Sequence, residues 1–350
     1  MKILHITFSL TNGGVENLLV DVANLQALDN DVRLIIINDH YEKDLMQRIS
    51  SRIRLKLYNR RPGAPFILTA FQLFLFILRT RPDIIHIHIP KLIVPTFFFR
   101  KKVVCTIHNV KINSKLIRFN KHLIAISKSV KTDMKTRYQK ESTLIYNAID
   151  TRKVVAKTLS PNGIHSFKIV QVSRLNHKQK GQDILIKAFK NISELNPDVT
   201  LTLIGDGASK QSLESLIRSE NLQDRIELIG NKDREWVYNN LHQYDIYVQP
   251  SRFEGFGLTV VEAILSGLPV IVSNVDGPME IIENGRYGLY FENENVNDLS
   301  EKIRLTIADY NSAAFKNKLT EARQHCSDTF DINTHVQQLS RLYSEILSKN

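Results

Sequence analysis

Two glutamates, Glu254 and Glu262, stand eight residues apart on either side of a glycine-containing turn, Gly255-Phe256-Gly257-Leu258. The apolar segment 246–249 before them has the pattern of a buried strand, and the segment 258–266 after them has the pattern of a helix. The free N–H groups and the positive dipole end at such a helix N-terminus favour a phosphate. The two carboxylates can both accept hydrogen bonds from hydroxyl groups. The segment therefore predicts a site for a ligand with an anionic centre and hydroxyl-rich ends, such as a nucleotide sugar.

A basic loop follows the first strand expected in the second half of the chain, with Arg174 and Lys180 near its two ends. A diphosphate leaving group gains negative charge as its bond to a sugar breaks. Fixed donors aimed at that charge stabilise the transition state, each by roughly 100- to 1000-fold in rate. Taken alone, this segment would be interpreted as a solvated basic loop. Its expected place beside the glutamate turn favours anion binding.

Further candidate residues also follow expected strands. Gly13 and Gly14 open the first helix, and paired glycines let the backbone approach a phosphate or a sugar closely. The full G-x-G-x-x-G fingerprint is missing, which disfavours a dinucleotide. Gly205-Asp206-Gly207 ends another strand and could line a nucleotide base or simply turn the chain. His108 ends the strand 103–107 and could contact a sugar or have a structural role.

No spacing typical of a zinc site appears in the sequence. Asp29 and Asp31 form a D-x-D string of the kind that some transferases use to hold a divalent cation. This string lies in a polar turn before a strand, far from the other motifs, so we interpret it as a solvated turn. The sequence therefore predicts neither a metal site nor a cofactor.

The length of 350 residues favours two domains over a single core. The hydrophobic content of 43% and the charged content of 24% are ordinary for a soluble globular chain. Cys105 and Cys326 are the only cysteines, which excludes a disulfide framework and favours a reducing cytoplasm. The N-terminus enters a strand pattern directly, without the apolar stretch and cleavage site of a signal peptide.

Positive charge is concentrated in the first half of the chain. Residues 1–160 contain 27 Lys and Arg against 11 Asp and Glu, whereas residues 161–350 contain 20 against 25. A basic half favours an anionic partner, either nucleic acid or an anionic membrane. Two apolar segments of this half, 66–78 and 92–99, are flanked by basic residues and are too short to span a bilayer. Each fits either a buried core helix or an interfacial helix with a basic rim.

Short apolar segments alternate with helical patterns along the chain, which is typical of parallel sheets covered on both faces. We expect an α/β architecture of two Rossmann-like domains, at 1–160 and 161–333, with the break near Thr151–Ser166. Ligands would bind beyond the strand ends, in a cleft between the domains. A last helix within 334–350 could pack back on the first domain. Strands are expected at 3–8, 32–37, 53–57, 84–87, 103–107, 123–126, 168–172, 200–204, 226–229, 246–249, 270–272 and 288–291, and helices at 16–28, 66–78, 128–138, 182–195, 210–220, 234–241, 258–266, 297–308 and 334–347.

Together these motifs resemble the retaining glycosyltransferases of family 4, which have the GT-B fold of two facing Rossmann-like domains. The resemblance runs nearly end to end. It depends above all on the E-x7-E pair Glu254 and Glu262. It is supported by four further motifs, which are Gly13-Gly14-Val15-Glu16, Arg174 with Lys180, Gly205-Asp206-Gly207 and the segment 273–282.

The resemblance implies a role for each matching residue. Arg174 and Lys180 would bind the donor diphosphate. Glu254 would hold hydroxyls of the donor sugar near the reacting carbon, and Glu262 would hydrogen-bond the ribose. His108 would contact the donor sugar from the acceptor side. The other positions implied at the donor are Gly13, Gly14, Gly205, Asp206, Gly207, Gly255, Phe256, Gly257 and Leu258, and Asn147 matches a strand-end motif before the linker.

The implied activity is transfer of a hexose or N-acetylhexosamine from a nucleotide sugar, expected to be UDP-linked, with retention of configuration and without a metal. The first domain would bind a lipid-linked saccharide used in capsule, exopolysaccharide or lipopolysaccharide assembly. The protein would be cytoplasmic and peripheral at the membrane, with no nucleic acid as partner. Two alternatives are a nucleotide-sugar epimerase or hydrolase on the same fold, and a non-catalytic protein that binds RNA or another anion with steep salt dependence.

Overall fold

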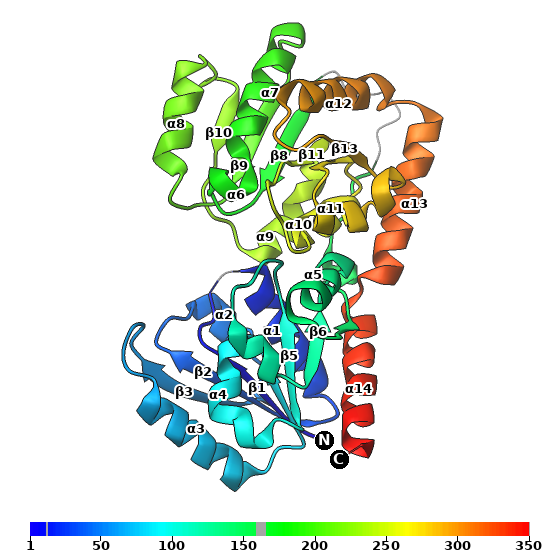
Figure 1. Ribbon diagram of the computed structural model, residues 1–350. Coiled ribbons are helices and arrows are strands. Elements are labelled where there is room, and N and C mark those ends of the chain that lie inside the picture. Colours follow the sequence, from blue (N-terminus) through cyan, green and yellow to red (C-terminus); the bar gives the residue numbers. More distant parts are fainter. Residues whose placement is uncertain (12, 159–165, 350) are drawn as a thin grey trace. The chain divides into compact units, whose positions relative to one another are not determined.

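The computed structural model describes residues 1–11, 13–158 and 166–349 (Figure 1). Its contacts divide the chain into two compact units. Unit 1 comprises Met1–Ala148 and Ile332–Asn350, and unit 2 comprises Ile149–Asp331. The sequence placed the two boundaries later, at residues 160 and 333. The Ser160-Pro161-Asn162-Gly163 break on which the first boundary was based lies outside the described residues.

Unit 1 is built on a seven-stranded parallel sheet in the order β3-β2-β1-β4-β5-β6-β7. Its strands are β1 (Lys2–Thr7), β2 (Asp31–Asn38), β3 (Arg54–Arg60), β4 (Ile84–Ile87), β5 (Val103–Ile107), β6 (His122–Ala125) and β7 (Thr143–Leu144). Its α-helices are α1 (Gly14–Gln26), α2 (Lys43–Gln47), α3 (Ile67–Thr80), α4 (Ile93–Thr96), α5 (Lys128–Tyr138) and α14 (Ile332–Ser348). The apolar segment 53–57 was expected to form a strand covered on both faces, but β3 is an edge strand whose side chains are mostly exposed, so that expectation was wrong.

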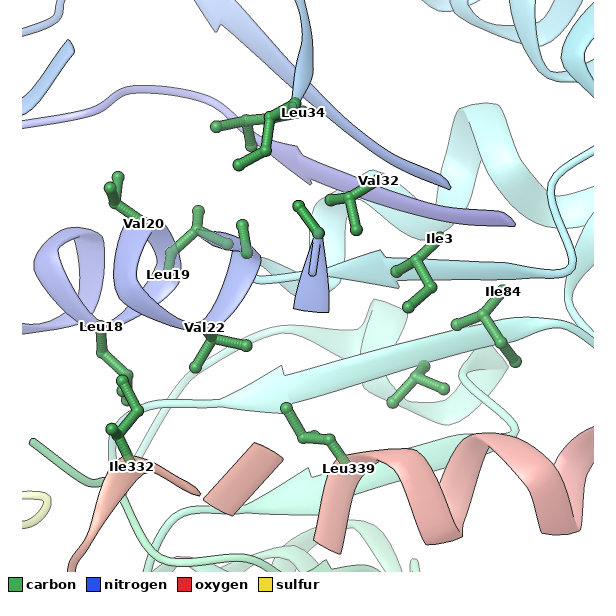
Figure 2. Close-up of a cluster of buried hydrophobic side chains, with 14 of the residues drawn as sticks. Ile3, Leu18, Leu19, Val20, Val22, Val32, Leu34, Ile84, Ile332 and Leu339 are labelled. Atoms are coloured by element: carbon green, nitrogen blue, oxygen red, sulfur yellow. The ribbon is translucent and has the colours of Figure 1, made fainter. Parts of the chain in front are cut away.

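The core of unit 1 lies between one face of this sheet and the helices α1 and α14. Strand side chains that point to this face, such as Ile3 of β1 and Ile84 of β4, pack with Leu19 of α1 and Leu339 of α14 in one buried cluster (Figure 2). The helix α14 follows unit 2 in the sequence but packs against α1 in unit 1. Its apolar stripe completes a core that the first 148 residues leave open.

Unit 2 is built on a six-stranded parallel sheet in the order β10-β9-β8-β11-β12-β13. From β8 the next strands in sequence, β9 and β10, are added on one side of the sheet, and β11 to β13 are added on the other side. The edge between β8 and β11 is therefore the switch point of the sheet, where the loops after these two strands lie side by side. The strands are β8 (Lys168–Val172), β9 (Thr200–Ile204), β10 (Ile226–Leu228), β11 (Ile246–Gln249), β12 (Val270–Ser273) and β13 (Leu289–Phe291). The α-helices are α6 (His177–Lys180), α7 (Gln182–Leu195), α8 (Lys210–Ser219), α9 (Arg234–Asn240), α10 (Leu258–Leu265), α11 (Asp276–Ile281), α12 (Val296–Asp309) and α13 (Ala313–Thr329).

Candidate active site

The candidate site of unit 2 lies where β8 and β11 end next to each other. The loop after β8 leads into α6, whose last residue is Lys180, and the loop after β11 carries Glu254. The Lys180 ammonium forms an ion pair with the Glu254 carboxylate. The two side chains are only 17% and 14% exposed, so water screens their attraction weakly. Arg174, at the start of the same β8 loop, is exposed. The sequence thus anticipated the meeting of these two loops.

A row of polar side chains along β11 positions Glu254. Tyr247 and Gln249 occupy alternate positions of β11 and therefore share one face of the strand, and Ser251 follows two residues after its last residue. The Tyr247 hydroxyl donates to Gln249 Oε1 at 2.7 Å, and Gln249 Nε2 donates to Ser251 Oγ at 2.7 Å. Ser251 Oγ in turn donates to Glu254 at 3.3 Å. Burial raises the pKa of the Tyr247 phenol, so the first donor of this row stays protonated.

The loops after β8 and β9 are held together by backbone hydrogen bonds. Ser173 N–H donates to Ile204 O at 2.9 Å, and Leu175 N–H donates to Asp206 O at 2.9 Å. Gly205 has a φ of +143°, and a Cβ there would lie 2.0 Å from Ser173 O. Gly207 is similarly close to Leu175. These two glycines therefore let the two loops approach, while their contact with a donor stays a prediction, as does that of Asp206.

Gly205→Ala is expected to destabilise unit 2 by more than about 2 kcal/mol, because the added Cβ collides with backbone that cannot move aside. Gly230→Ala is the matched control. Gly230 also has positive φ, +74°, but a Cβ there would have no neighbour within 4 Å. We expect the control to lose only about 1–2 kcal/mol. Urea unfolding followed by the fluorescence of Trp236 measures both, and equal losses would contradict this account.

Arg252 ties the β11 loop to the helices that follow β8. Its guanidinium donates two hydrogen bonds of 2.9 Å to the Asp183 carboxylate and one of 2.6 Å to His177 O. It also pairs with Glu294 at 2.6 Å. Burial alone would raise the pKa of Asp183, but the hydrogen bonds from Arg252 hold it below its usual value. The sequence did not single out Arg252, although it lies two residues before Glu254.

Glu262 lies in the second turn of α10, as the sequence predicted, and is 6% exposed. Burial raises the pKa of its carboxyl to about 7, against the lowering effect of Arg234. Arg234 Nε lies 3.7 Å from Glu262 Oε1, and both side chains are buried. Burial therefore favours the protonated form of the Glu262 carboxyl more than water would. No spacing rule connects Arg234 to Glu262, so the sequence missed this arginine.

The turn before α10 is tightly packed within unit 2. Gly257 caps the helix with a φ of +104°, a conformation that favours glycine, and Leu258 is the first helical residue. Phe256 is 2% exposed, and its ring packs against Phe330 at 5.4 Å between centroids. Gly255 is buried as well. The Phe256 side chain is therefore not available to a donor, and the contact predicted for this residue could be made only by its backbone.

The remaining predicted site residues belong to unit 1. Gly13 and Gly14 begin α1, and a Cβ on Gly13 would meet mainly the flexible carboxylate of Glu16, at 2.3 Å. Asn12 of the same motif lies outside the described residues. His108 follows β5, and Asn147 is buried near the end of unit 1. Their roles toward a donor stay predictions.

Unit 1 contains a stack of histidines that the sequence did not reveal as a group. The register of β1 and β4 pairs His5 with His86, and His88 and His108 follow at the ends of β4 and β5. Successive ring centroids from His5 to His108 lie 5.2, 4.5 and 5.7 Å apart. We call these four residues the histidine ladder. Both ring nitrogens of His108 and Nδ1 of His88 are buried without a hydrogen-bond partner among the described residues.

Three members of the ladder offer nitrogen atoms close enough to share a metal ion. The donor atoms of His5, His86 and His88 lie within 4.8 Å of one another. However, His86 is hydrogen-bonded through both nitrogens, to Tyr343 OH at 2.6 Å and to Thr106 Oγ1 at 2.7 Å. The three ligands would also leave a buried dication uncompensated by any carboxylate of the group, which is costly. We therefore interpret His5, His86 and His88 as part of the folded core and not as a metal site.

The D-x-D string has contacts of its own in unit 1. Asp31 begins β2 and pairs with Arg33 at 3.5 Å and with Arg54 at 3.8 Å, whereas Asp29 is exposed. The pair with Arg54 connects β2 to β3, whereas Arg33 lies on β2 itself. The interpretation of the string as a solvated turn stays a prediction.

Two family models match the chain. A model for glycosyl transferases group 1 matches residues 161–324, and a model for Glycosyltransferase Family 4 matches residues 12–153. An uncharacterized glycosyltransferase of Methanocaldococcus jannaschii is 32% identical over 64% of this chain, which spans only 59% of that relative's length. The N-acetylgalactosamine-N,N'-diacetylbacillosaminyl-diphospho-undecaprenol 4-alpha-N-acetylgalactosaminyltransferase of Campylobacter jejuni is 23% identical over 89% of this chain and 92% of that protein.

Solved structures show the same fold. The HepE protein of Anabaena, crystallised with UDP and glucose, superposes with a TM-score of 0.83 at 24% identity, over 98% of this chain and 99% of HepE. Both sheets are parallel and covered by helices, as expected from the alternating pattern (Figure 1). The fold is the α/β two-domain fold of GT-B proteins. The chain belongs to the GT-B glycosyltransferases of the family 4 type.

Proposed function

We propose that this protein is a retaining glycosyltransferase that moves a hexose or N-acetylhexosamine from a UDP-linked donor to a lipid-linked saccharide. The observation that carries this proposal is the shielded Lys180–Glu254 ion pair at the switch point of unit 2. It places a cation for a diphosphate next to a carboxylate for sugar hydroxyls. HepE binds UDP and glucose, and the Campylobacter relative is named for a diphospho-undecaprenol-linked substrate, which supports this choice of donor and acceptor.

The proposed reaction proceeds on one face of the donor sugar. The bond from the anomeric carbon to the diphosphate oxygen breaks, and the acceptor oxygen forms its bond on the same side. The acceptor proton passes to the leaving diphosphate. Arg174 and Lys180 would stabilise the charge that this group acquires. Glu254 would orient the sugar hydroxyls, and Glu262 would accept a hydrogen bond from the ribose.

The cations of the protein supply the charge that a metal provides in other transferases, so we propose catalysis without a metal or cofactor. The acceptor would belong to cell-surface polysaccharide biosynthesis, and the enzyme would act from the cytoplasmic face of the membrane as a peripheral protein. None of the helices within the described residues has the length and hydrophobicity needed to span a bilayer.

A screen of nucleotide sugars tests the donor site. A UDP-sugar is expected to stabilise the wild type by about 2.7 kcal/mol at a hundredfold excess over Kd, and Glu262→Ala much less. Thermal shift with UDP-, GDP- and other nucleotide-linked sugars measures this. Glu227→Ala, an exposed carboxylate on β10, is the control and should behave as wild type. If no nucleotide sugar stabilises the wild type, the proposal fails. Turnover of the donor without any acceptor would favour the hydrolase or epimerase alternative.

A further inference from the structure

One helix of unit 1 is apolar on the side that faces solvent. The helix α3 buries only Thr69, Leu73 and Ile77, while Ile67 is 83% exposed, Leu68 67% and Phe71 57%. A helix that is apolar all round is normally enclosed by protein or lipid. The sequence left two possibilities for this segment, core helix or interfacial helix. The exposure of α3 excludes an enclosed core helix.

The short helices after β4 extend this apolar surface. Phe98 is 83% exposed and Val94 is 54% exposed. The Phe98 ring lies 5.8 Å from that of Phe74 on α3, and α3 contacts α4 directly (Figure 1). The Phe97 ring lies 6.1 Å from that of Phe119. The exposed residues of this surface, which we call the α3–α4 face, are Ile67, Leu68, Phe71, Leu78, Val94, Phe97, Phe98 and Phe119.

The chain that forms the α3–α4 face is almost free of acidic residues. Residues 45–132 contain 18 Lys and Arg but a single acidic residue, Asp83. Basic side chains flank the apolar elements directly and are exposed, among them Arg61, Arg79, Arg81, Lys91, Arg100, Lys101, Lys115, Arg118 and Lys121. An exposed apolar surface with cations around it is the pattern of a protein that inserts into the headgroup region of an anionic bilayer.

We propose that the α3–α4 face docks this protein on an anionic membrane, with Phe71 and Phe98 inserted at the level of the acyl boundary. A second copy of the chain is disfavoured as the occupant, because two faces of such high like charge repel each other. Nucleic acid is disfavoured because its charged backbone would leave the exposed aliphatic side chains Ile67, Leu68 and Val94 without an apolar partner.

Docking would bring unit 1 to the surface that carries the lipid-linked acceptor, so the biological purpose of this face rests on the proposed function. The docking itself does not depend on that function. The basic residues would set the preference for anionic lipid, and salt would weaken this contribution. The apolar residues would hold the protein once it has arrived.

Co-sedimentation with vesicles of phosphatidylcholine, with and without phosphatidylglycerol, tests the proposal. The wild type is expected to bind the anionic vesicles more strongly and to bind them less well at high salt. The double variant Phe71→Ser/Phe98→Ser is expected to lose about tenfold or more in vesicle affinity, since each ring removes apolar area from water on insertion. Both positions are exposed, so the fold should be retained, and unchanged thermal unfolding would show this.

Two controls test whether vesicle binding depends on the α3–α4 face itself and not on exposed apolar or basic residues elsewhere on the protein. Leu195→Ser removes a 70% exposed leucine in unit 2 and should leave vesicle binding unchanged. Arg79→Glu should weaken binding to anionic vesicles, whereas Arg323→Glu, on an exposed position of α13, should not. Equal binding by the double variant and the wild type would overturn the proposal. So would absence of vesicle binding together with salt-dependent capture of RNA.

Vesicle binding needs no nucleotide sugar, and the donor thermal shift needs no membrane. If the wild type shows the thermal shift with a donor but does not bind vesicles, the proposed docking through the α3–α4 face is refuted and the proposed donor site is not. The opposite result would refute the donor site alone.

Discussion

Lys180→Met is expected to lower kcat/KM for sugar transfer by about 100- to 1000-fold. Lys180 is the shielded cation of the site, and removal of one fixed donor from a developing negative charge costs this much in well-ordered sites. Glu254 would keep its hydrogen bond from Ser251, so unit 2 should stay folded. The loss is expected mainly in kcat, because the diphosphate gains charge as the bond breaks. Steady-state kinetics with saturating acceptor measure both constants.

Lys190→Met provides the matched control. Lys190 is also a lysine of unit 2 in an ion pair, with Glu220 at 2.7 Å, but it lies on α7 and is 42% exposed. Surface pairs of this kind contribute little, so activity and stability should hardly change. A Lys180→Met enzyme with nearly wild-type kcat would show that the ion pair has only a structural role. Glu254→Gln gives a second measure, since it removes the carboxylate charge and keeps the shape.

The positions of strands and of long amphipathic helices followed from the sequence because apolar periodicity reports burial directly. The strands 84–87, 103–107 and 168–172 have the predicted limits, as has the helix 182–195. The helix α13 was missed because only Ala322 and Cys326 of its 17 residues are buried, so it has almost no apolar stripe to detect. The short helices α6 and α11 escaped because four and six residues are too few to show a helical apolar period.

The candidate site was predictable where residues follow adjacent strands. Lys180 and Glu254 were expected together because parallel strands end at one edge of a sheet. Arg234 and Arg252 were not expected, since their contacts with Glu262 and Asp183 depend on side-chain directions that spacing does not encode. The exposure of α3 could not be predicted either. An apolar sequence indicates that contact with water is unfavourable, but it does not indicate whether protein or lipid covers the helix.

Mild acid is expected to unfold unit 1 because of its buried histidines. Burial lowers the pKa of His5, His108 and His335 to about 4 from an ordinary value of 6.5. Above pH 6.5 these groups are neutral in both states and have no effect. As the pH falls from 6.5 to 4, the unfolded chain binds protons that the folded chain excludes, so stability decreases. Each histidine contributes about 1.4 kcal/mol per pH unit. The three together can remove about 10 kcal/mol by pH 4, comparable to the stability of a whole domain.

The hydrogen bonds of His5 with Gln26 and of His335 with Tyr146 O oppose the lowering of their pKa values, whereas a neighbouring histidine lowers the pKa of His108 further. His86 and His88 also have strongly lowered pKa values, through burial first and then through neighbouring imidazoles. Urea unfolding between pH 7 and 4 measures the loss. Trp236, the single tryptophan, reports unit 2 by fluorescence, while hydrogen exchange of β1, β4 and β5 reports unit 1. His335→Gln can still donate to Tyr146 O, as Nδ1 of His335 does at 2.6 Å, but cannot titrate. It should therefore recover about 3 kcal/mol of the loss at pH 4. If exchange in unit 1 stays as slow at pH 4.5 as at pH 7, after correction for intrinsic rates, the histidines are not held neutral by the fold.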